Sequence, residues 1–330
     1  MNNVNAAKSY GILTARTFNQ SLEDAKNQKV PFCLFGVFIY ENEITILFSD
    51  TNTGKTILAI QICQAIASGI PIHPDFAVEC LAQIVLYLDF EMTDKQLEKR
   101  YSRDWQDHFS FSDNLIRATI DYDFIIPDNQ TLSDSILAQV NSIVQSTKAK
   151  VIVIDNLTYL NDDFEKSKAV LPLMRLLKKL KTQLGITFII LAHTPKIPQG
   201  QPISINHLAG SKQLANFIDA AFAVGRVAKD EKLRYIKQVK TRSEMIYHSD
   251  NVPVFEIKKI HNDNFLAFDF LERYENEYKL LEAPTTSERE SDVDFILSER
   301  ERGQSFQEIA KELGISKTTA YRIFQKNKDI

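Results

Sequence analysis

The chain has 330 residues, 44% of them hydrophobic and 25% charged, which is typical of a soluble folded protein with one large core and a small accessory domain. Its formal net charge is −4 and its pI is about 5.9, so a general positive field that attracts nucleic acid is excluded, and any such contact must be local. The polar first residues (MNNVNAAKSYG) exclude a signal-peptide core and no apolar run reaches 18 residues, so we expect a cytoplasmic protein without a membrane span.

The first two thirds of the chain alternate between strand and helix patterns. Residues 1–30 are polar and predict a loosely held N-terminal arm. Short apolar runs rich in β-branched residues then predict strands buried on both faces, at 44–48, 84–90, 151–155 and 187–193. Helices are predicted at 57–68, from Thr93 through the repeat that ends at Trp105, at 132–144 and at 168–184. This alternation predicts βαβ units and a mostly parallel sheet.

The last third has two further patterns. Segments 233–240, 252–260 and 265–270 alternate between apolar and polar residues, which predicts an antiparallel extension of the sheet. Residues 282–291 (EAPTTSERES) have no period and predict a linker, and the rest is helical in pattern. The expected domains are therefore an arm (1–30), an α/β core (31–281), the linker (282–291) and a small all-α domain (292–330).

The segment after the first predicted strand fits the phosphate-binding pattern G-x-x-x-x-G-K-[ST], except that Ser stands at its first position. It consists of Ser49, Asp50, Thr51, Asn52, Thr53, Gly54, Lys55 and Thr56. In such loops backbone N–H groups and a helix N-terminus surround the β-phosphate, and Gly54 allows close approach. We expect Lys55 to neutralise charge on the β- and γ-phosphates and Thr56 to bind Mg²⁺. The alternative is a chance Gly-Lys-Thr at a helix start.

Polar residues end three of the predicted strands, and doubly wound sheets bind ligands at the carboxyl ends of their strands. Asp155 is expected to hold the water shell of Mg²⁺. Glu91 is the best candidate for orienting the attacking water, with Asp89 as the alternative base. His193 is expected to sense the γ-phosphate. Each could be a capping or surface residue, but with the phosphate loop they predict ATP hydrolysis.

Two cations, Lys240 and Arg242, follow the strand predicted at 233–240. The functional interpretation is an arginine finger, Arg242, that reaches the γ-phosphate of a neighbouring subunit with Lys240 assisting. The alternative is a solvated basic turn.

These elements, in this order, resemble the RecA-like hexameric ATPases, and most of all the RepA-type plasmid-replication helicases, which are related to the DnaB-type helicases. The carrying segments are SDTNTGKT, VLYLDFEM, VIVIDNL, LAHTPK, GSKQLANFIDAAFAV and KTRSE, within residues 30–270. The resemblance implies a ring or open ring of six subunits, with ATP between neighbours and Arg242 supplied in trans. It also implies single-stranded DNA binding by central loops, here within 196–212.

The C-terminal residues have the pattern of a helix-turn-helix. Ser305 and Glu308 form a predicted capping box, Ser316 is a second cap, and QEIAKELGISKTTAYRIF resembles the helix-turn-helix of resolvases and many bacterial regulators. Candidate DNA contacts on the last helix are Lys317, Thr318, Thr319, Tyr321, Arg322 and Lys326. Residues 317–330 carry a net charge of +3, which is the footprint expected of a helix in the major groove. The alternative is a three-helix domain that docks a protein.

The sequence thus predicts an α/β RecA-like P-loop core with an antiparallel extension and a small all-α helix-turn-helix domain. ATP and Mg²⁺ are the expected cofactors, and DNA and further copies of the chain are the expected partners. The leading function is an ATP-driven, DNA-associated motor or loader of the kind carried by mobile elements. The alternatives are an ATP-gated DNA-binding regulator and a nucleotide-gated scaffold for a protein, neither of which translocates.

Overall fold

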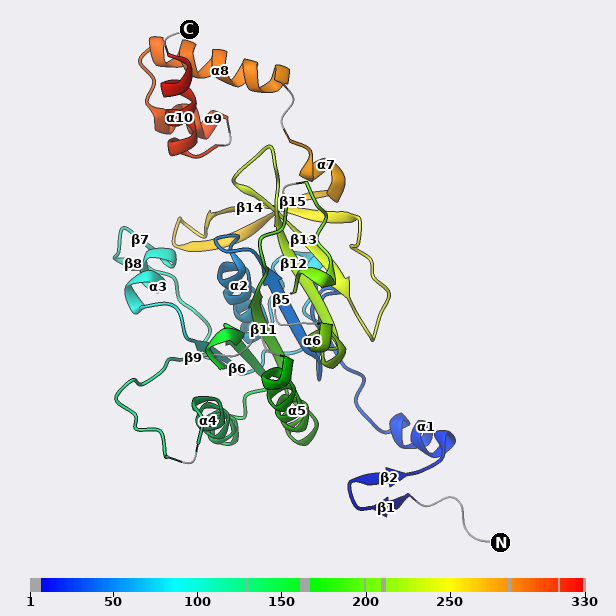
Figure 1. Cartoon of the computed structure of the whole chain (residues 1–330). Coiled ribbons are helices and arrows are strands. Elements are labelled where there is room, and N and C mark those ends of the chain that lie inside the picture. Colours follow the sequence, from blue (N-terminus) through cyan, green and yellow to red (C-terminus); the bar gives the residue numbers. More distant parts are fainter. Residues whose placement is uncertain are drawn as a thin grey trace. The chain divides into compact units, whose positions relative to one another are not determined.

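The computed structural model describes residues 7–128, 130–160, 167–198, 200–208, 212–283, 286–313 and 315–328 (Figure 1). The chain divides into two compact units between Phe32 and Cys33, close to the predicted end of the arm. The first unit contains the hairpin β1 (Lys8–Tyr10) and β2 (Leu13–Ala15) and the helix α1 (Phe18–Lys26). Thr17 caps α1 by accepting the amide of Gln20, and no residue of this helix is buried.

Nine of the strands found among the described residues form one sheet, in the order β15-β14-β13-β12-β5-β11-β10-β6-β9. They are β5 (Ile44–Ser49), β6 (Val85–Asp89), β9 (Leu115–Ala118), β10 (Val151–Asp155), β11 (Thr187–His193), β12 (Ala220–Arg226), β13 (Leu233–Lys240), β14 (Asn251–Ile260) and β15 (Phe265–Asn276). From β12 to β9 all neighbours are parallel, and β12 to β15 pair antiparallel. The mostly parallel sheet with its antiparallel extension therefore agrees with the expected RecA-like α/β core.

The helices of the core are α2 (Lys55–Ser68), α3 (Asp94–Arg100), α4 (Leu132–Thr147), α5 (Ser167–Leu184), α6 (Lys212–Phe217) and α7 (Glu277–Leu281). Short elements complete it: β3 (Cys33–Phe35), β4 (Ile39–Tyr40), β7 (Ser102–Arg103), β8 (Asp107–His108), and 3-10 turns at Pro74–Phe76, Leu157–Leu160 and Ile205–His207. Side chains alternate between the faces of the sheet, as the two-residue period of a strand requires. Along β5, Leu47 packs in the core that includes α2, whereas Ile46 and Phe48 pack in the core that includes α4 and α5.

Two sequence predictions about helices need correction. The helix predicted through Trp105 ends at Arg100, because Asp104 and Trp105 have positive φ and turn the chain between β7 and β8. The linker predicted at 282–291 is helical from Thr286, since its Ser-Glu-Arg-Glu run consists largely of good helix formers.

Three helices end the chain: α8 (Thr286–Glu301), α9 (Phe306–Glu312) and α10 (Lys317–Asn327). The predicted capping box of Ser305 and Glu308 is present, and Ser316 caps α10 as predicted. The ring of Phe306 packs edge-on against the ring of Tyr321. Nothing among the described helices is both long and apolar enough to cross a membrane.

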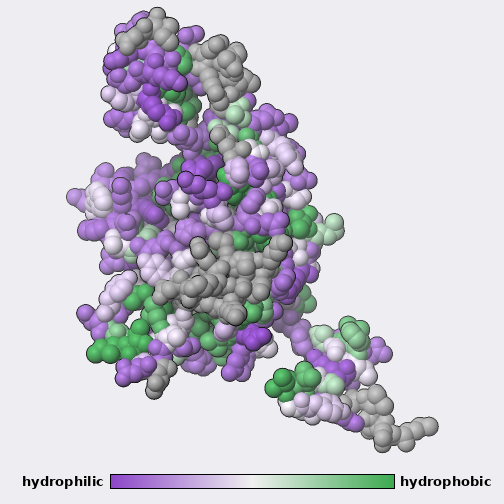
Figure 2. All heavy atoms as spheres, viewed as in Figure 1, coloured by the Kyte–Doolittle hydropathy of each residue, from purple (hydrophilic) through white to green (hydrophobic). Residues whose placement is uncertain are grey.

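The visible surface differs in kind between two parts of the second unit (Figure 2). Apolar atoms gather on the segment that precedes α4, where Tyr122 and Ile125 are 81% and 87% exposed. The surface over α9 and α10 is mostly hydrophilic. Contacts made by the two regions are therefore expected to differ, apolar in the first and polar in the second.

Candidate functional site

The loop between β5 and α2 has the shape of an anion cradle. Asn52 and Gly54 adopt positive φ, of 57° and 101°, which turns the chain into the N-terminus of α2. A Cβ at Gly54 would lie 2.9 Å from the side chains of Ile257 and Phe268, so the antiparallel extension requires glycine there as well. The helix N-terminus, with its free N–H groups and positive dipole, thus ends at a loop suited to phosphate.

Ser49 replaces the usual first glycine of such a loop without cost to its shape. It is the last residue of β5, is 1% exposed and pairs in register with His193, in ordinary extended backbone. Its hydroxyl donates to the Asp50 carbonyl at 3.0 Å and contacts the hydroxyl of Thr53. The serine therefore serves as an internal tie of the loop.

Lys55 lies inside the cradle and is 7% exposed. Its Nζ donates to the Ser49 carbonyl at 3.2 Å and lies 3.1 Å from Nδ1 of His193. Burial lowers the pKa of Lys55 to about 8, although the carboxylates of Asp155 and Glu91 oppose the shift. A buried ammonium of this kind gains strongly from an anionic ligand.

Asp155 ends β10 beside the loop, as predicted. Its Oδ2 accepts from the hydroxyl of Tyr87 at 2.7 Å, and its carboxylate is also hydrogen-bonded by Thr56. Burial raises the pKa of Asp155 to about 6, and the hydroxyl partners reduce the shift only in part. A buried carboxylate next to a hydroxyl is the donor set that Mg²⁺ accepts from a P-loop protein.

Glu91 and His193 meet through a residue that sequence reasoning missed. Asn156, directly after β10 and 3% exposed, donates through Nδ2 to Oε1 of Glu91, and this nitrogen lies 3.1 Å from Nε2 of His193. His193 Nε2 is also 3.8 Å from the Glu91 carboxylate, and together with the Lys55 charge it holds the pKa of Glu91 below its usual value. Lys55, His193, Asn156 and Glu91 therefore form one polar chain at the carboxyl edge of the sheet.

Asp89, the alternative base, has both of its carboxylate oxygens engaged by neighbouring groups. Its Oδ1 accepts the amides of Glu91 and Met92 at 3.2 and 2.9 Å, and its Oδ2 accepts from Arg117 at 2.8 Å. A carboxylate engaged in this way orders the turn around it, so the geometry favours Glu91 as the base.

Lys240 and Arg242 lie at the opposite edge of the sheet. Lys240 donates to the carbonyl of Ile218 at 2.8 Å, and Arg242 lies 3.3 Å from Asp219. Asp219 also accepts the amide of Ile44, the first residue of β5, whereas the phosphate loop follows the last residue of that strand. Six residues of extended chain span about 17 Å, so neither cation reaches the phosphate loop of its own chain.

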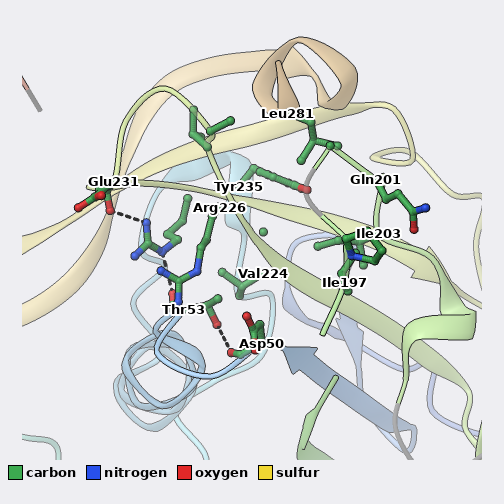
Figure 3. A pocket seen from close by; sticks show the side chains of 16 residues that line it. Asp50, Thr53, Ile197, Gln201, Ile203, Val224, Arg226, Glu231, Tyr235 and Leu281 are labelled. Carbon is green, nitrogen blue, oxygen red and sulfur yellow. Dashed lines mark hydrogen bonds between the residues drawn. The ribbon is translucent and has the colours of Figure 1, made fainter. Parts of the chain in front are cut away.

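Two arginines of the β12–β13 hairpin brace the outer side of the phosphate loop, and sequence reasoning missed both. Arg226 donates to the Thr51 carbonyl at 2.7 Å, and Arg234 donates to the Thr53 carbonyl at 3.0 Å. Arg234 also donates to the carbonyl of Glu231 at 2.7 Å (Figure 3). These contacts tie the turn of the hairpin to the loop.

A cavity of about 610 Å³ adjoins these arginines. Asp50 and Thr53 of the phosphate loop lie at its lower side in Figure 3, and Tyr235 lies above them in this view. Ile197 and Ile203, from the segment after β11, form the opposite wall. Part of the predicted DNA-binding loop (196–212) thus lines a cavity beside the phosphate loop, while residues 199 and 209–211 of that loop lie outside the described part of the chain.

The candidate DNA contacts lie along α10. Lys317, Thr318, Tyr321, Arg322 and Lys326 are exposed, whereas Thr319 is half-buried. The Thr319 hydroxyl donates to Oε1 of Glu231 at 3.1 Å. The basic face of α10 is therefore largely open, apart from its first turn.

Residues 24–199, just over half of the chain, match the protein family described as an AAA domain. A solved structure that resembles the chain is the crystal structure of the KaiC-like protein PH0186 from the hyperthermophilic archaeon Pyrococcus horikoshii OT3. The two are 17% identical with a TM-score of 0.46, over 70% of this chain and 90% of that one. No curated protein sequence matches the chain.

Proposed function

This chain belongs to the AAA domain family of P-loop proteins, and we propose that it binds and hydrolyses ATP at the carboxyl edge of its sheet. The observation that carries the proposal is the polar chain from Lys55 through His193 and Asn156 to Glu91. It joins a phosphate-binding lysine to a carboxylate suited to activate water, which are the two groups that phosphoryl transfer to water requires.

The roles of the side chains follow from their surroundings. Lys55 stabilises negative charge on the phosphates, because burial deprives its ammonium of water and an anionic ligand compensates for that loss. Glu91 orients the attacking water and accepts its proton, since its lowered pKa keeps it ionised at neutral pH. His193 lies between the two and responds to the γ-phosphate through Lys55. Asn156 holds Glu91 and His193 at a fixed separation.

Thr56 and Asp155 fit the hydroxyl and carboxylate that bind magnesium in such sites. When bound, Mg²⁺ supplies positive charge that neutralises the phosphates. The cavity beside the phosphate loop has a volume suited to a nucleoside, with apolar walls for a base. We assign the base and ribose to this cavity.

The cations of the amino edge complete the site only from a second copy. Arg242 is 44% exposed, and in its own chain it lies a strand's length from the phosphate loop. We therefore retain the sequence-based proposal that Arg242, assisted by Lys240, acts in trans in a homo-oligomer, with a six-membered ring as the form that the resemblance implies.

The leading function remains an ATP-driven motor or loader on DNA. The family and the cluster at the carboxyl edge support its ATPase part, and the basic face of α10 supports its contact with DNA. The test is ATP hydrolysis with and without single- and double-stranded DNA. Stimulation by single strands is the result expected of the motor, and hydrolysis that is insensitive to both forms of DNA contradicts it.

DNA contact through α10 has its own test. Removing residues 286–330 leaves every residue assigned to phosphate chemistry, so hydrolysis survives while duplex binding falls. Arg322→Ala loses roughly 1–3 kcal/mol of duplex binding free energy if Arg322 contacts a base edge. Unchanged duplex binding by the shortened protein assigns the three helices to a protein partner instead.

A second candidate function, an ATP-gated DNA-binding regulator, is favoured by one set of contacts. Glu231, at the turn of the β12–β13 hairpin, accepts the amide of Ser316 and the hydroxyl of Thr319 through its two carboxylate oxygens, both at 3.1 Å. Lys232 donates to the carbonyl of Lys311 at 3.0 Å. The hairpin that braces the phosphate loop therefore also holds the first turn of α10.

In this regulator, nucleotide bound at the phosphate loop changes the strength of the contacts between the hairpin and α10. Glu231→Gln weakens the contacts of the hairpin with the first turn of α10. We expect this variant to bind duplex DNA roughly 5-fold more tightly without nucleotide, and to lose its response to a non-hydrolysable ATP analogue. Glu256→Gln, on β14, is the matched control. If duplex affinity and its response to nucleotide are unchanged in Glu231→Gln, the regulator is excluded.

A further inference from the structure

Next to Glu91 lies an ion pair between Arg117, to which neither the sequence nor the family match assigns a role, and Asp89, which the sequence offers only as the alternative base. Arg117 on β9 and Asp89 at the end of β6 belong to neighbouring strands, and Arg117 stands in register with Tyr87, two residues before Asp89. The side chain of Asp89 is fully buried and that of Arg117 is 24% exposed. Their distance, 2.8 Å between Nε and Oδ2, makes this a charge-assisted hydrogen bond shielded from water.

All three nitrogens of the Arg117 guanidinium are engaged around the turn that carries Glu91. Nε donates to Asp89, Nη2 donates to the Met92 carbonyl at 2.6 Å, and Nη1 donates to Asp94 at 2.5 Å. Asp94 is 92% exposed, so that last contact contributes little. The other two bind the turn on either side of Glu91.

Asp89, at the end of β6, fixes the same turn from its other side. Its Oδ1 accepts the amides of Glu91 and Met92, so this carboxylate fixes the backbone of Glu91 directly. The amide of Phe90 is also fixed, by the Asp155 carbonyl at 2.9 Å. With this backbone fixed, the Glu91 side chain points into the site, where Asn156 donates a hydrogen bond to it.

We propose that Arg117 and Asp89 are positioning residues that aim the Glu91 carboxylate at the attacking water. The proposal rests on the proposed function, because it needs Glu91 as the base. A misplacement of a reacting group by about 1 Å can cost 100-fold in rate, so a rigid turn at this point affects turnover directly. Binding of ATP does not depend on the pair, since neither residue contacts the phosphate loop.

The test is a double-mutant cycle between Arg117→Gln and Glu91→Gln in the full-length protein. We expect Arg117→Gln to lower kcat about 10- to 100-fold while the Kd for ATP stays within about twofold. In the Glu91→Gln background, the same substitution lowers kcat less than about twofold, because its effect passes through Glu91. Arg103→Gln, on β7 and paired with Asp107 at the surface, is the matched control and leaves kcat unchanged.

Arg117→Lys keeps a cation next to Asp89 and loses the fork to Met92. It is expected to give an intermediate kcat, and it replaces Arg117→Gln in the double-mutant cycle if Arg117→Gln does not fold. Equal losses of kcat in both backgrounds, or an unchanged kcat in Arg117→Gln, overturn the proposal. If Glu91→Gln hydrolyses ATP like the parent protein, the assignment of the base fails as well; if Glu91→Gln is slow and Arg117→Gln is not, only the positioning role is wrong.

Discussion

Asp155 at the carboxyl edge of the central sheet and Asp219 at its amino edge are both buried, and their carboxyl groups are held in opposite ways. At the carboxyl edge, Asp155 has the hydroxyls of Tyr87 and Thr56 as partners, and burial raises its pKa to about 6. At the amino edge, Asp219 is also buried, which alone would raise its pKa. Hydrogen bonds from Lys181 and a backbone amide outweigh burial and hold that pKa below its usual value.

This difference separates a structural charge from a ligand-binding one. The Asp219 carboxylate is compensated by cations of its own chain, and it fixes the start of β5 by accepting the amide of Ile44. The Asp155 carboxylate is stabilised only weakly by hydroxyls, and it gains when a cation binds. Arg242 belongs to the compensated edge but is half-exposed, so it can serve a neighbour. Strongly perturbed pKa values of this kind cluster at functional sites.

The largest expected effect is at the carboxyl edge. Lys55→Ala removes the charge of the phosphate cradle and touches nothing at the amino edge, so hydrolysis falls to background while the fold is retained. Phosphate release and far-ultraviolet circular dichroism measure the two. Undiminished hydrolysis in this variant rules out the nucleotide site altogether.

Glu91→Gln is expected to have the next largest effect. It keeps the shape of the side chain and its contact with Asn156 but removes the base, so hydrolysis falls by about two to four orders of magnitude while ATP still binds. Single-turnover hydrolysis and equilibrium ATP binding separate the two steps. If Asp89→Asn shows this loss of chemistry and Glu91→Gln does not, the base is Asp89.

Substituting the two aspartates compares the edges directly. At pH 7 without nucleotide, Asp219→Asn should lower the free energy of unfolding by about 1–3 kcal/mol, because cations lose their partner. Asp155→Asn should raise it by about 1–3 kcal/mol, since the raised pKa means that the charged form destabilises the fold at this pH. Urea unfolding measures both, and shifts of the same sign contradict the comparison.

The dependence of ATP affinity on pH is the smallest effect. Burial lowers the pKa of Lys55 to about 8 in the free protein, and only its charged form binds phosphate well. The Kd for ATP should therefore rise about tenfold between pH 7 and 9. Lys55→Arg, which stays charged, is the control and should show a flat profile over this range. Equal affinities of the parent protein at both pH values contradict the lowered pKa of Lys55.

The carboxyl edge was largely predictable from the sequence. Four apolar runs predicted the strands, and since parallel strands end at one edge, the residues after them had to meet. Asn156 follows one of these runs directly and carries the same positional signal as Glu91 and His193. Its role was not predicted, because an amide lacks the charge that marks a carboxylate as a candidate site residue.

The bracing arginines could not be predicted in the same way. Arg226 and Arg234 lie more than 170 residues from the loop that they contact, and the contact depends on how β12 and β13 pair. β12 itself is rich in Ala and Gly, which have low strand propensity. Its Gly225 is explained only by packing, because a Cβ there would overlap the ring of Tyr235. β9 could not be predicted from the sequence either, since it is four residues long and half-buried.

The most direct test of the account mixes two inactive variants. If one catalytic site combines the carboxyl edge of one copy with the amino edge of the next, Arg242→Ala binds ATP but does not hydrolyse it alone, and Lys55→Ala is inactive for the opposite reason. Co-assembled, the two should regain part of the ATPase activity of the parent, at interfaces where an intact Lys55 faces an intact Arg242. Normal hydrolysis by Arg242→Ala alone, or no recovery in mixtures with confirmed co-assembly, would contradict a site shared between copies.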